Sequence, residues 1–153
     1  MCCRDTHFAS TAWRLTRSGA TRSVAHGFEV AIASAGCKTE FVKQFLSRRV
    51  DGDIFTDAFF NSTAFQMCQK DKTVSLTPIV GFFGLDTARQ CAILFDDTNY
   101  NGGYARSIGM GFEWVNNGNL EYKVGEQGIR ASNFFNALAS WAKTCPEPPA
   151  APL

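Results

Sequence analysis

Residues 91–107 read CAILFDDTNYNGGYARS, and this stretch carries the strongest fold signal in the chain. Within it, Phe95 precedes Tyr100 by five residues, and Gly102 follows two residues later. This spacing predicts a hairpin in which the two aromatic rings pack together. The glycine is expected to adopt φ > 0, a backbone conformation that other residues resist.

The same aromatic spacing occurs forty residues earlier, at Phe55 and Phe60. A period of about forty residues is typical of one four-stranded Greek key unit. Short apolar runs separated by turn residues are expected for an antiparallel β-sandwich. The runs are residues 73–80, 92–95, 104–110, 112–115 and 120–124, with a predicted hairpin turn at 116–119.

These patterns resemble the βγ-crystallin superfamily, which repeats a hairpin of Tyr/Phe, four residues, Tyr/Phe, one residue and Gly. Residues 91–107 are particularly similar to its secreted microbial members, which include streptomycete metalloproteinase inhibitors and killer toxins. The resemblance covers residues 53–145. It implies a mainly β protein with a βγ-crystallin-like Greek key β-sandwich.

The resemblance also implies a calcium site shared between the hairpins and a closing stretch rich in Asn, Asp, Ser and Thr. Asn136 and Ser140 match that closing stretch, and Asp57 and Asp96 lie in the two hairpins. Ala137 replaces the second acidic or amide residue of the family pattern. Since calcium needs six to eight oxygen ligands, the expected site is degenerate. No other cofactor is expected.

One helix is predicted ahead of the hairpins, at residues 39–49 (TEFVKQFLSRR), because its apolar residues share one helical face. Residues 133–143 fit a short helix or a structured loop. The helix at 39–49 also suits an alternative fold, an α+β cone resembling the NTF2-like family. The 14 phenylalanines of the chain would then line a small-ligand pocket.

The four cysteines after residue 26 are disulfide candidates. Four cysteines allow two bridges in three connectivities, and the sequence does not choose among them. Buried free thiols are the alternative. The candidates are Cys37, Cys68, Cys91 and Cys145.

Residues 1–26 are basic, with four arginines against one acidic residue, and are rich in Ser, Thr and Ala. That composition is typical of a mitochondrial transit peptide, and an upstream extension is the alternative. The resemblance favours an extracellular location; a mitochondrial or cytoplasmic one is the alternative. We predict four parts: a disordered basic leader or extension (1–26), a strand and helix segment (27–52), the βγ-crystallin-like domain (53–145) and a Pro-rich tail (146–153).

Residues 30–39 (VAIASAGCKT) resemble a strand, phosphate loop and helix, and residues 92–96 (AILFD) resemble a Walker B strand. A P-loop needs glycines that let backbone amides face the phosphates. Ile32 replaces the first of them, and Cys37 precedes the lysine. Nucleotide binding is therefore not favoured. Asp97 and the residue before it fit turn residues that hydrogen-bond local amides.

The composition argues against several classes of function. A net charge of +1 gives no electrostatic case for nucleic acid, and apolar runs of about six residues are far shorter than a membrane span. Both histidines lie within residues 1–26, so the rest has none for a triad or zinc site. We predict a non-enzymatic secreted binding or inhibitory module (protease-inhibitor-like, toxin-like or structural), whose partner and oligomeric state stay open. The alternative is a small-ligand-binding α+β cone protein, with or without weak enzymatic activity.

Overall fold

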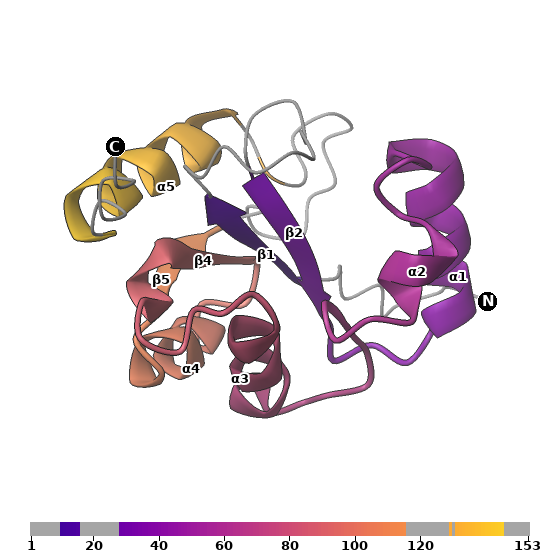
Figure 1. The fold of residues 1–153 in the computed structure, drawn as a ribbon, viewed down its shortest axis with the longest axis horizontal. Coiled ribbons are helices and arrows are strands. Elements are labelled where there is room, and N and C mark those ends of the chain that lie inside the picture. The colour runs from indigo at the N-terminus through magenta and orange to yellow at the C-terminus, as the bar shows by residue number, and fades with distance from the viewer. Residues whose placement is uncertain (1–9, 16–27, 116–128, 130, 146–153) are drawn as a thin grey trace, which may run out of the picture.

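The computed structural model describes residues 10–15, 28–115, 129 and 131–145. These residues form a five-stranded sheet of order β3-β2-β1-β4-β5, with helices packed around it (Figure 1). The strands are β1 (Ser10–Leu15), β2 (Phe28–Ala33), β3 (Phe65–Gln66), β4 (Ala92–Asp96) and β5 (Gly111–Trp114). The helices are α1 (Thr39–Phe45), α2 (Asp57–Phe60), α3 (Lys72–Phe82), α4 (Asn101–Ser107) and α5 (Ala131–Thr144), with a π-helical turn η1 (Leu46–Val50) and a 3₁₀ turn η2 (Arg89–Cys91).

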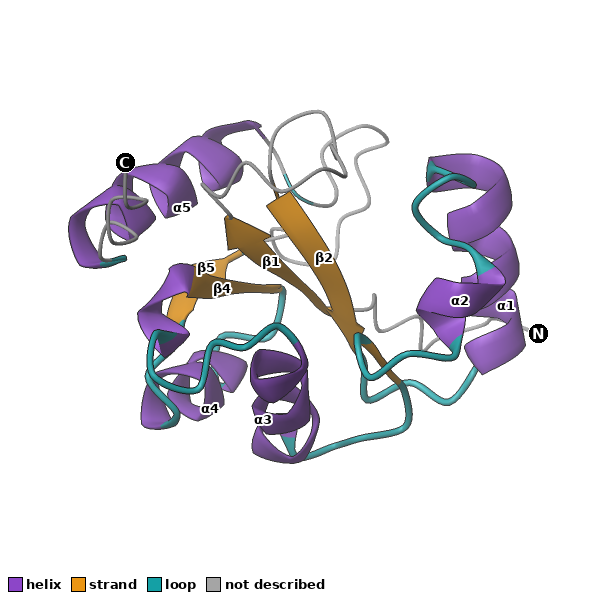
Figure 2. Cartoon of the chain, viewed as in Figure 1, coloured by secondary structure: helices purple, strands orange, loops and turns teal. Residues whose placement is uncertain are grey.

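Four of the five strands run in the same direction. β2 pairs with β3, and β4 with β5, in parallel. The central β1 is antiparallel to both β2 and β4, and Figure 2 shows β1 and β2 side by side. Parallel strands need long crossover connections, usually helical. Here α3 lies in the connection that leads from β3, at one edge of the sheet, to β4 in the other half.

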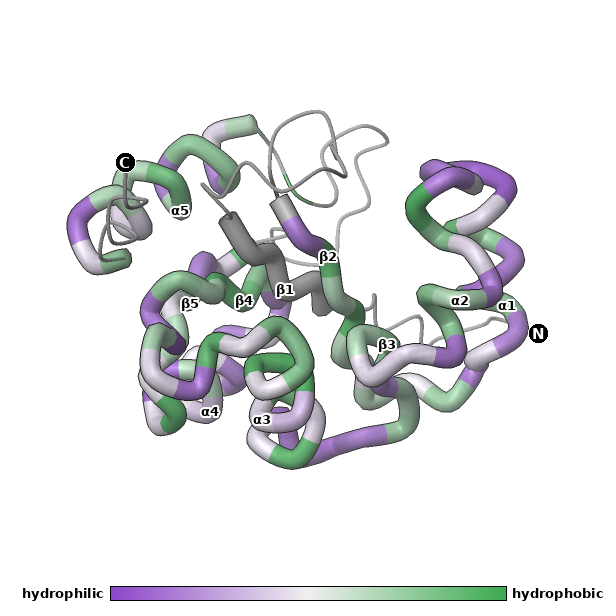
Figure 3. The backbone as a smooth tube through the Cα atoms, in the orientation of Figure 1, coloured by the Kyte–Doolittle hydropathy of each residue, from purple (hydrophilic) through white to green (hydrophobic). Residues whose placement is uncertain are grey.

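β2 is buried on both faces of the sheet, because successive side chains of a strand point to opposite faces. Ala31 and Ala33 pack in a cluster with Leu76 of α3. Val30 and Ile32 pack in a second cluster, which covers the opposite face with residues of α1, η1 and α2. Hydropathy colouring shows β2 hydrophobic after its first residues (Figure 3).

The side chains of β4 alternate between two hydrophobic clusters in the same way. Ala92 and Leu94 join the cluster with α3 and α4, and Ile93 and Phe95 join a third cluster with α5. The runs VAIA and AILF are therefore continuously apolar because they are covered from both sides, as is typical of parallel sheets. The architecture is three-layered, helix on sheet on helix.

The expected strand at residues 73–80 is wrong, because this segment belongs to α3. The Asp71 side chain caps the helix and accepts a hydrogen bond from the backbone N of Thr73 at 2.8 Å. Leu76, Ile79 and Val80 are buried and recur every three or four residues, which is the period of one helix face. The helical period thus outweighs the β-branched composition.

The predicted hairpin at 55–62 is also wrong, since the short capped helix α2 (Asp57–Phe60) occupies the middle of this segment. The Thr56 hydroxyl accepts from the backbone N of Phe59. Phe55 and Phe60 are both buried, and each makes an edge-to-face contact with another ring, Phe59 and Phe65 respectively. They are core residues of the helical layer and do not form a hairpin pair.

The predicted hairpin at 95–102 is the end of β4, a turn and the start of α4. Phe95 is 2% exposed and Tyr100 is 72% exposed, and the Tyr100 ring contacts Tyr104. Gly102 lies inside α4, and φ is not positive there. A Cβ at Gly102 would lie 2.5 Å from Cδ1 of Phe112, so glycine is required for close approach and not for a turn.

Both fold classes expected from the sequence, the Greek key β-sandwich and the α+β cone, are therefore wrong. Among the described residues, α5 has 14 residues and α3 has 11, whereas no strand exceeds 6. The structure confirms the helix at 39–49, as α1 and η1, and of the two alternatives for residues 133–143 it selects the helix, within α5. It also confirms strands within 92–95 and 112–115, and makes 104–110 largely helical.

Other expectations concern the basic leader and segments nearer the C-terminus. Residues 10–15, inside the expected leader, form the central strand β1. The predicted turn at 116–119, the run at 120–124 and the tail at 146–153 lie outside the described residues.

Candidate functional site

The carboxyl ends of β2 and β4 bring polar residues to one edge of the sheet. β2 is followed directly by Ser34, and β4 ends at Asp96 with Asp97 next. The antiparallel β1 begins at this edge, with Ser10 opposite Ala33. From β2 and β4 the sheet continues outward in opposite directions, to β3 and β5. In open α/β sheets, ligands bind at such a switch point, outside the carboxyl ends of the strands.

A buried lysine lies at this edge. Lys72 is the first residue of α3, and its side chain is 3% exposed. Its Nζ donates a hydrogen bond to the carbonyl oxygen of Ala33 at 2.6 Å and lies 3.6 Å from Oδ2 of Asp96. Lysine is almost never fully buried without a partner. Because Ala33 and Asp96 are the last residues of β2 and β4, the ammonium joins the two halves of the sheet.

Asp96 is oriented by its own loop. Its Oδ1 accepts a hydrogen bond from the backbone N of Thr98 at 2.8 Å, and its Oδ2 accepts from Nδ2 of Asn101 at 2.9 Å. Asn101 is 5% exposed, and its Oδ1 is buried with no hydrogen-bond partner among the described residues. Buried polar atoms are rarely left unpaired, and each exception points to a structural or functional cause.

Burial shifts the pKa values of Lys72 and Asp97, which distinguishes them from residues of an exposed ion pair. Burial lowers the pKa of Lys72, and the carboxylates of Asp96 and Asp97 oppose that shift. Burial, and then the neighbouring Asp96 carboxylate, raise the pKa of the half-buried Asp97. Trp114, at the end of β5, donates from Nε1 to the carbonyl oxygen of Asp97 at 3.1 Å and so holds this loop against the sheet. Shifted pKa values clustered at one site are typical of function.

The β2–α1 loop supplies the remaining polar group. Ser34 is 2% exposed, and its Oγ accepts a hydrogen bond from the backbone N of Gly36 at 3.1 Å. Its backbone is fixed by Gln66, whose carbonyl oxygen accepts from Ser34 N at 2.9 Å, and by Gln69, whose N donates to the Ser34 carbonyl at 3.1 Å. We call Ser34, Lys72, Asp96, Asp97 and Asn101 the Lys72–Asp96 site.

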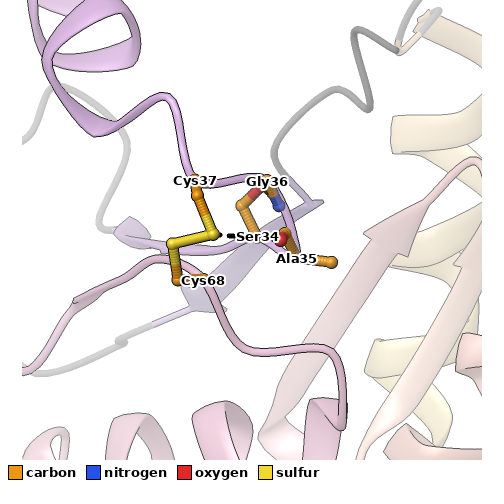
Figure 4. Close-up of a disulfide and its surroundings, with 5 residues drawn as sticks. All are labelled: Ser34, Ala35, Gly36, Cys37 and Cys68. Carbon is orange, nitrogen blue, oxygen red and sulfur yellow. Dashed lines mark hydrogen bonds between the residues drawn. A yellow bond between two sulfur atoms is a disulfide. The ribbon is translucent and has the colours of Figure 1, made fainter.

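The two disulfides expected from the cysteine count are confirmed, and the structure selects their connectivity. Cys37 pairs with Cys68, and Cys91 pairs with Cys145. The first bond links the β2–α1 loop, which begins at Ser34, to the chain that follows β3, as Figure 4 shows. The second joins the turn before β4 to the end of α5.

The residues proposed for calcium lie on separate elements. Asn136 and Ser140 are exposed on α5, and Asp57 is exposed on α2, at the other end of the molecule (Figure 1). Asp96 lies in the Lys72–Asp96 site. The described residues contain no group of three or more His, Cys, Asp or Glu side chains suited to a metal ion.

Sequence reasoning missed Lys72, Ser34 and Asn101. The expectation that Asp96 hydrogen-bonds a local amide is confirmed by its bond from Thr98 N, but its burial, at 4% exposed, has no signal in that pattern. The available signal was the pair of runs VAIAS and AILFDD, each a continuous apolar strand that ends in a polar residue. The strand, loop and helix order noted at residues 30–39 is confirmed by β2 and α1.

Comparisons with protein-family models, with curated proteins and with solved structures find no match to this chain. Within the described residues, no helix has both the length and the apolar character needed to cross a membrane. The geometry of the Lys72–Asp96 site is thus the basis for a functional proposal.

Proposed function

We propose that the Lys72–Asp96 site binds the phosphoryl group of a small phosphorylated molecule together with a divalent cation, for which Mg²⁺ is the expected ion. The single observation that carries this proposal is the buried ammonium of Lys72, held between the ends of β2 and β4 beside two carboxylates. Burying a charge is costly unless binding or structure compensates for it.

Asp96 and Asp97 supply the hard oxygen atoms that Mg²⁺ prefers. This ion dehydrates reluctantly and is usually bound by one or two protein carboxylates plus ligand phosphates, without an all-protein cage. Two adjacent carboxylates, Asp96 and Asp97, fit that pattern. The unpaired Oδ1 of Asn101 gives a further oxygen that can accept a hydrogen bond from a metal-bound water.

Lys72 and Ser34 supply the phosphoryl side of the site. A lysine ammonium offers three donors and a compact charge, and it is a common phosphate ligand. One ammonium and two carboxylates give the side chains of the site a formal net charge of −1, which repels a phosphoryl dianion. A bound Mg²⁺ reverses that sign, so the proposal requires phosphoryl affinity to depend on the cation.

Calorimetric titration of inorganic phosphate, with and without Mg²⁺, tests the proposal. Binding is expected only with the cation, and Lys72→Met is expected to weaken it at least tenfold. Lys70→Met is the matched control, because Lys70 is exposed two residues before Lys72, ahead of α3, and its loss should leave the affinity unchanged. Binding without Mg²⁺ at the same affinity, or equal loss in both variants, contradicts the proposal.

The secreted binding or inhibitory role stays a prediction. The proposed phosphoryl binding agrees with its alternative in one respect, the binding of a small ligand. An extracellular location is also part of the proposal. Two disulfides support it, because such bonds persist in oxidising compartments. Mass analysis of protein alkylated during extraction from its native source tests it: four alkylated cysteines among Cys37, Cys68, Cys91 and Cys145 contradict this location.

A further inference from the structure

We propose that the Cys37–Cys68 disulfide is a reversible thiol–disulfide exchange site, and that its reduction by a dithiol weakens phosphoryl binding at the Lys72–Asp96 site. This inference rests on the proposed function.

The two disulfides differ in their exposure to solvent. Cys37 and Cys68 are both exposed. In the second bond, Cys91 is 5% exposed and Cys145 is half-buried. Exchange requires a thiolate to reach a disulfide sulfur, and exposed disulfides are the labile and regulatory ones. A soluble dithiol should therefore reduce Cys37–Cys68 first.

The exposed bond joins the two segments that carry the phosphoryl side of the site. Cys37 follows Ser34 by three residues, and Cys68 precedes Lys72 by four. The segments are also linked by the short pairing of β2 with β3, by the hydrogen bond from Ser34 N to the Gln66 carbonyl, and by two backbone hydrogen bonds between residues 34–36 and 68–69. Those two bonds run from Cys68 N to the Gly36 carbonyl at 3.2 Å and from Gln69 N to the Ser34 carbonyl at 3.1 Å. Figure 4 shows the bond beside Ser34 and Gly36.

The backbone at Cys68 has a reason to move when the bond opens. Its φ of 63° places it in the left-handed region, and among the described residues it is the one non-glycine there. Such residues persist where the surrounding structure over-determines them. The cross-link is one of these constraints, so reduction allows the chain from Cys68 to Lys72 to relax and to draw the ammonium away from Asp96.

The exchange balances as a two-electron reaction. One thiolate of the dithiol attacks a sulfur of the bond and forms a mixed disulfide, and the other cysteine leaves as a thiolate. The second thiolate of the reductant then displaces the first cysteine. The products are the Cys37 and Cys68 thiols, which have gained two electrons and two protons, and the oxidised cyclic disulfide of the dithiol.

The experiment titrates inorganic phosphate with Mg²⁺ into the oxidised protein, the dithiothreitol-reduced protein and the reoxidised protein, with the bonds counted by alkylation and mass analysis. We expect Cys37–Cys68 to open while Cys91–Cys145 stays closed, and the affinity to fall at least tenfold and return on reoxidation. The double variant Cys37→Ser/Cys68→Ser should bind phosphate weakly, and dithiothreitol should not change its affinity.

The outcomes separate the two proposals. If the oxidised protein does not bind phosphate, the proposed function fails and this inference fails with it. If the oxidised protein binds and the reduced protein binds equally well, only the exchange site is overturned. Preferential opening of Cys91–Cys145 overturns it as well. Should the double variant fail to fold, hydrogen exchange of wild-type residues 66–72 replaces it, and unchanged protection after reduction counts against the inference.

Discussion

Nζ of Lys72 lies 3.6 Å from Oδ2 of Asp96, and both side chains are 3% exposed. The pair joins the first turn of α3 to the end of β4. In the sheet, the antiparallel β1 separates β4 from β2, whose last residue also binds Lys72. Such a buried pair costs desolvation free energy, and breaking it leaves one charge uncompensated. The stability of the fold and the chemistry of the site therefore depend on the same two residues.

Replacing one member of this pair should destabilise the protein more than replacing both. Lys72→Met leaves the Asp96 carboxylate buried without its cation, and a broken buried pair typically costs about 3–5 kcal/mol. The double variant Lys72→Met/Asp96→Asn removes both charges and should lose less than the single variant. Urea unfolding at neutral pH measures each free energy of unfolding. A loss in the double variant equal to the sum of the losses in Lys72→Met and Asp96→Asn would contradict a coupled pair.

Two adjacent glycines of α4 should respond in opposite ways to alanine. Gly102→Ala places a Cβ 2.5 Å from Cδ1 of Phe112, and overpacking of this kind costs roughly 1–3 kcal/mol. Gly103→Ala meets nothing within 4 Å and should stabilise α4 by about 0.4–1 kcal/mol. Thermal unfolding of the two variants distinguishes them, and Phe112→Leu should partly rescue Gly102→Ala. Equal effects at both positions would mean that α4 does not pack closely on Phe112.

The sequence permitted correct predictions wherever one local pattern dominated. The apolar face of residues 39–49 predicted α1 and η1, and the cysteine count predicted two bridges. The run AILF predicted β4, because a short, continuously apolar run is typical of a strand covered on both faces. These signals need no information about distant parts of the chain.

The errors arose where spacing alone was used to infer a contact. Phe95 and Tyr100 have hairpin spacing, yet one ring is buried against the α5 layer and the other is exposed. Gly102 fits a turn by composition, but its position is set by Phe112, ten residues later. Lys72 has no local signal at all, since its partners Ala33 and Asp96 lie 39 and 24 residues away. Only the strand order brings these residues together.

The cap of α3 should make stability depend on acid pH. Oδ1 of Asp71 accepts hydrogen bonds from Oγ1 of Thr73 at 2.7 Å and from its backbone N at 2.8 Å. The side-chain hydrogen bond first, and then the backbone one, lower the pKa of Asp71. Since the folded-state pKa is the lower one, the contribution of this carboxylate is fully present above its ordinary pKa of about 3.9. It is lost as the pH falls through the lowered value.

Asp71→Asn keeps a capping oxygen but removes the titration, so its stability should fall less than that of wild type between about pH 5 and pH 2. Thr73→Val removes the hydroxyl donor and should give an intermediate slope. Urea unfolding across this pH range measures all three proteins. Parallel pH profiles for wild type and Asp71→Asn would show that Asp71 does not contribute in this way.

The disulfide between Cys91 and Cys145 should stabilise the fold mainly through the unfolded state. It spans 54 residues of sequence, and loop-closure entropy for such a span corresponds to about 4 kcal/mol. Cys91→Ala/Cys145→Ala should lose about that much in urea unfolding under non-reducing conditions. Hydrogen exchange should also show lower protection in α5, which packs on Ile93 and Phe95 through Ala137. Cys37→Ala/Cys68→Ala is the matched control: its bond spans 31 residues, so the loss should be similar, but protection in α5 should not change. A loss below about 1 kcal/mol in the first variant would show that packing of α5, and not the cross-link, determines the stability of this layer.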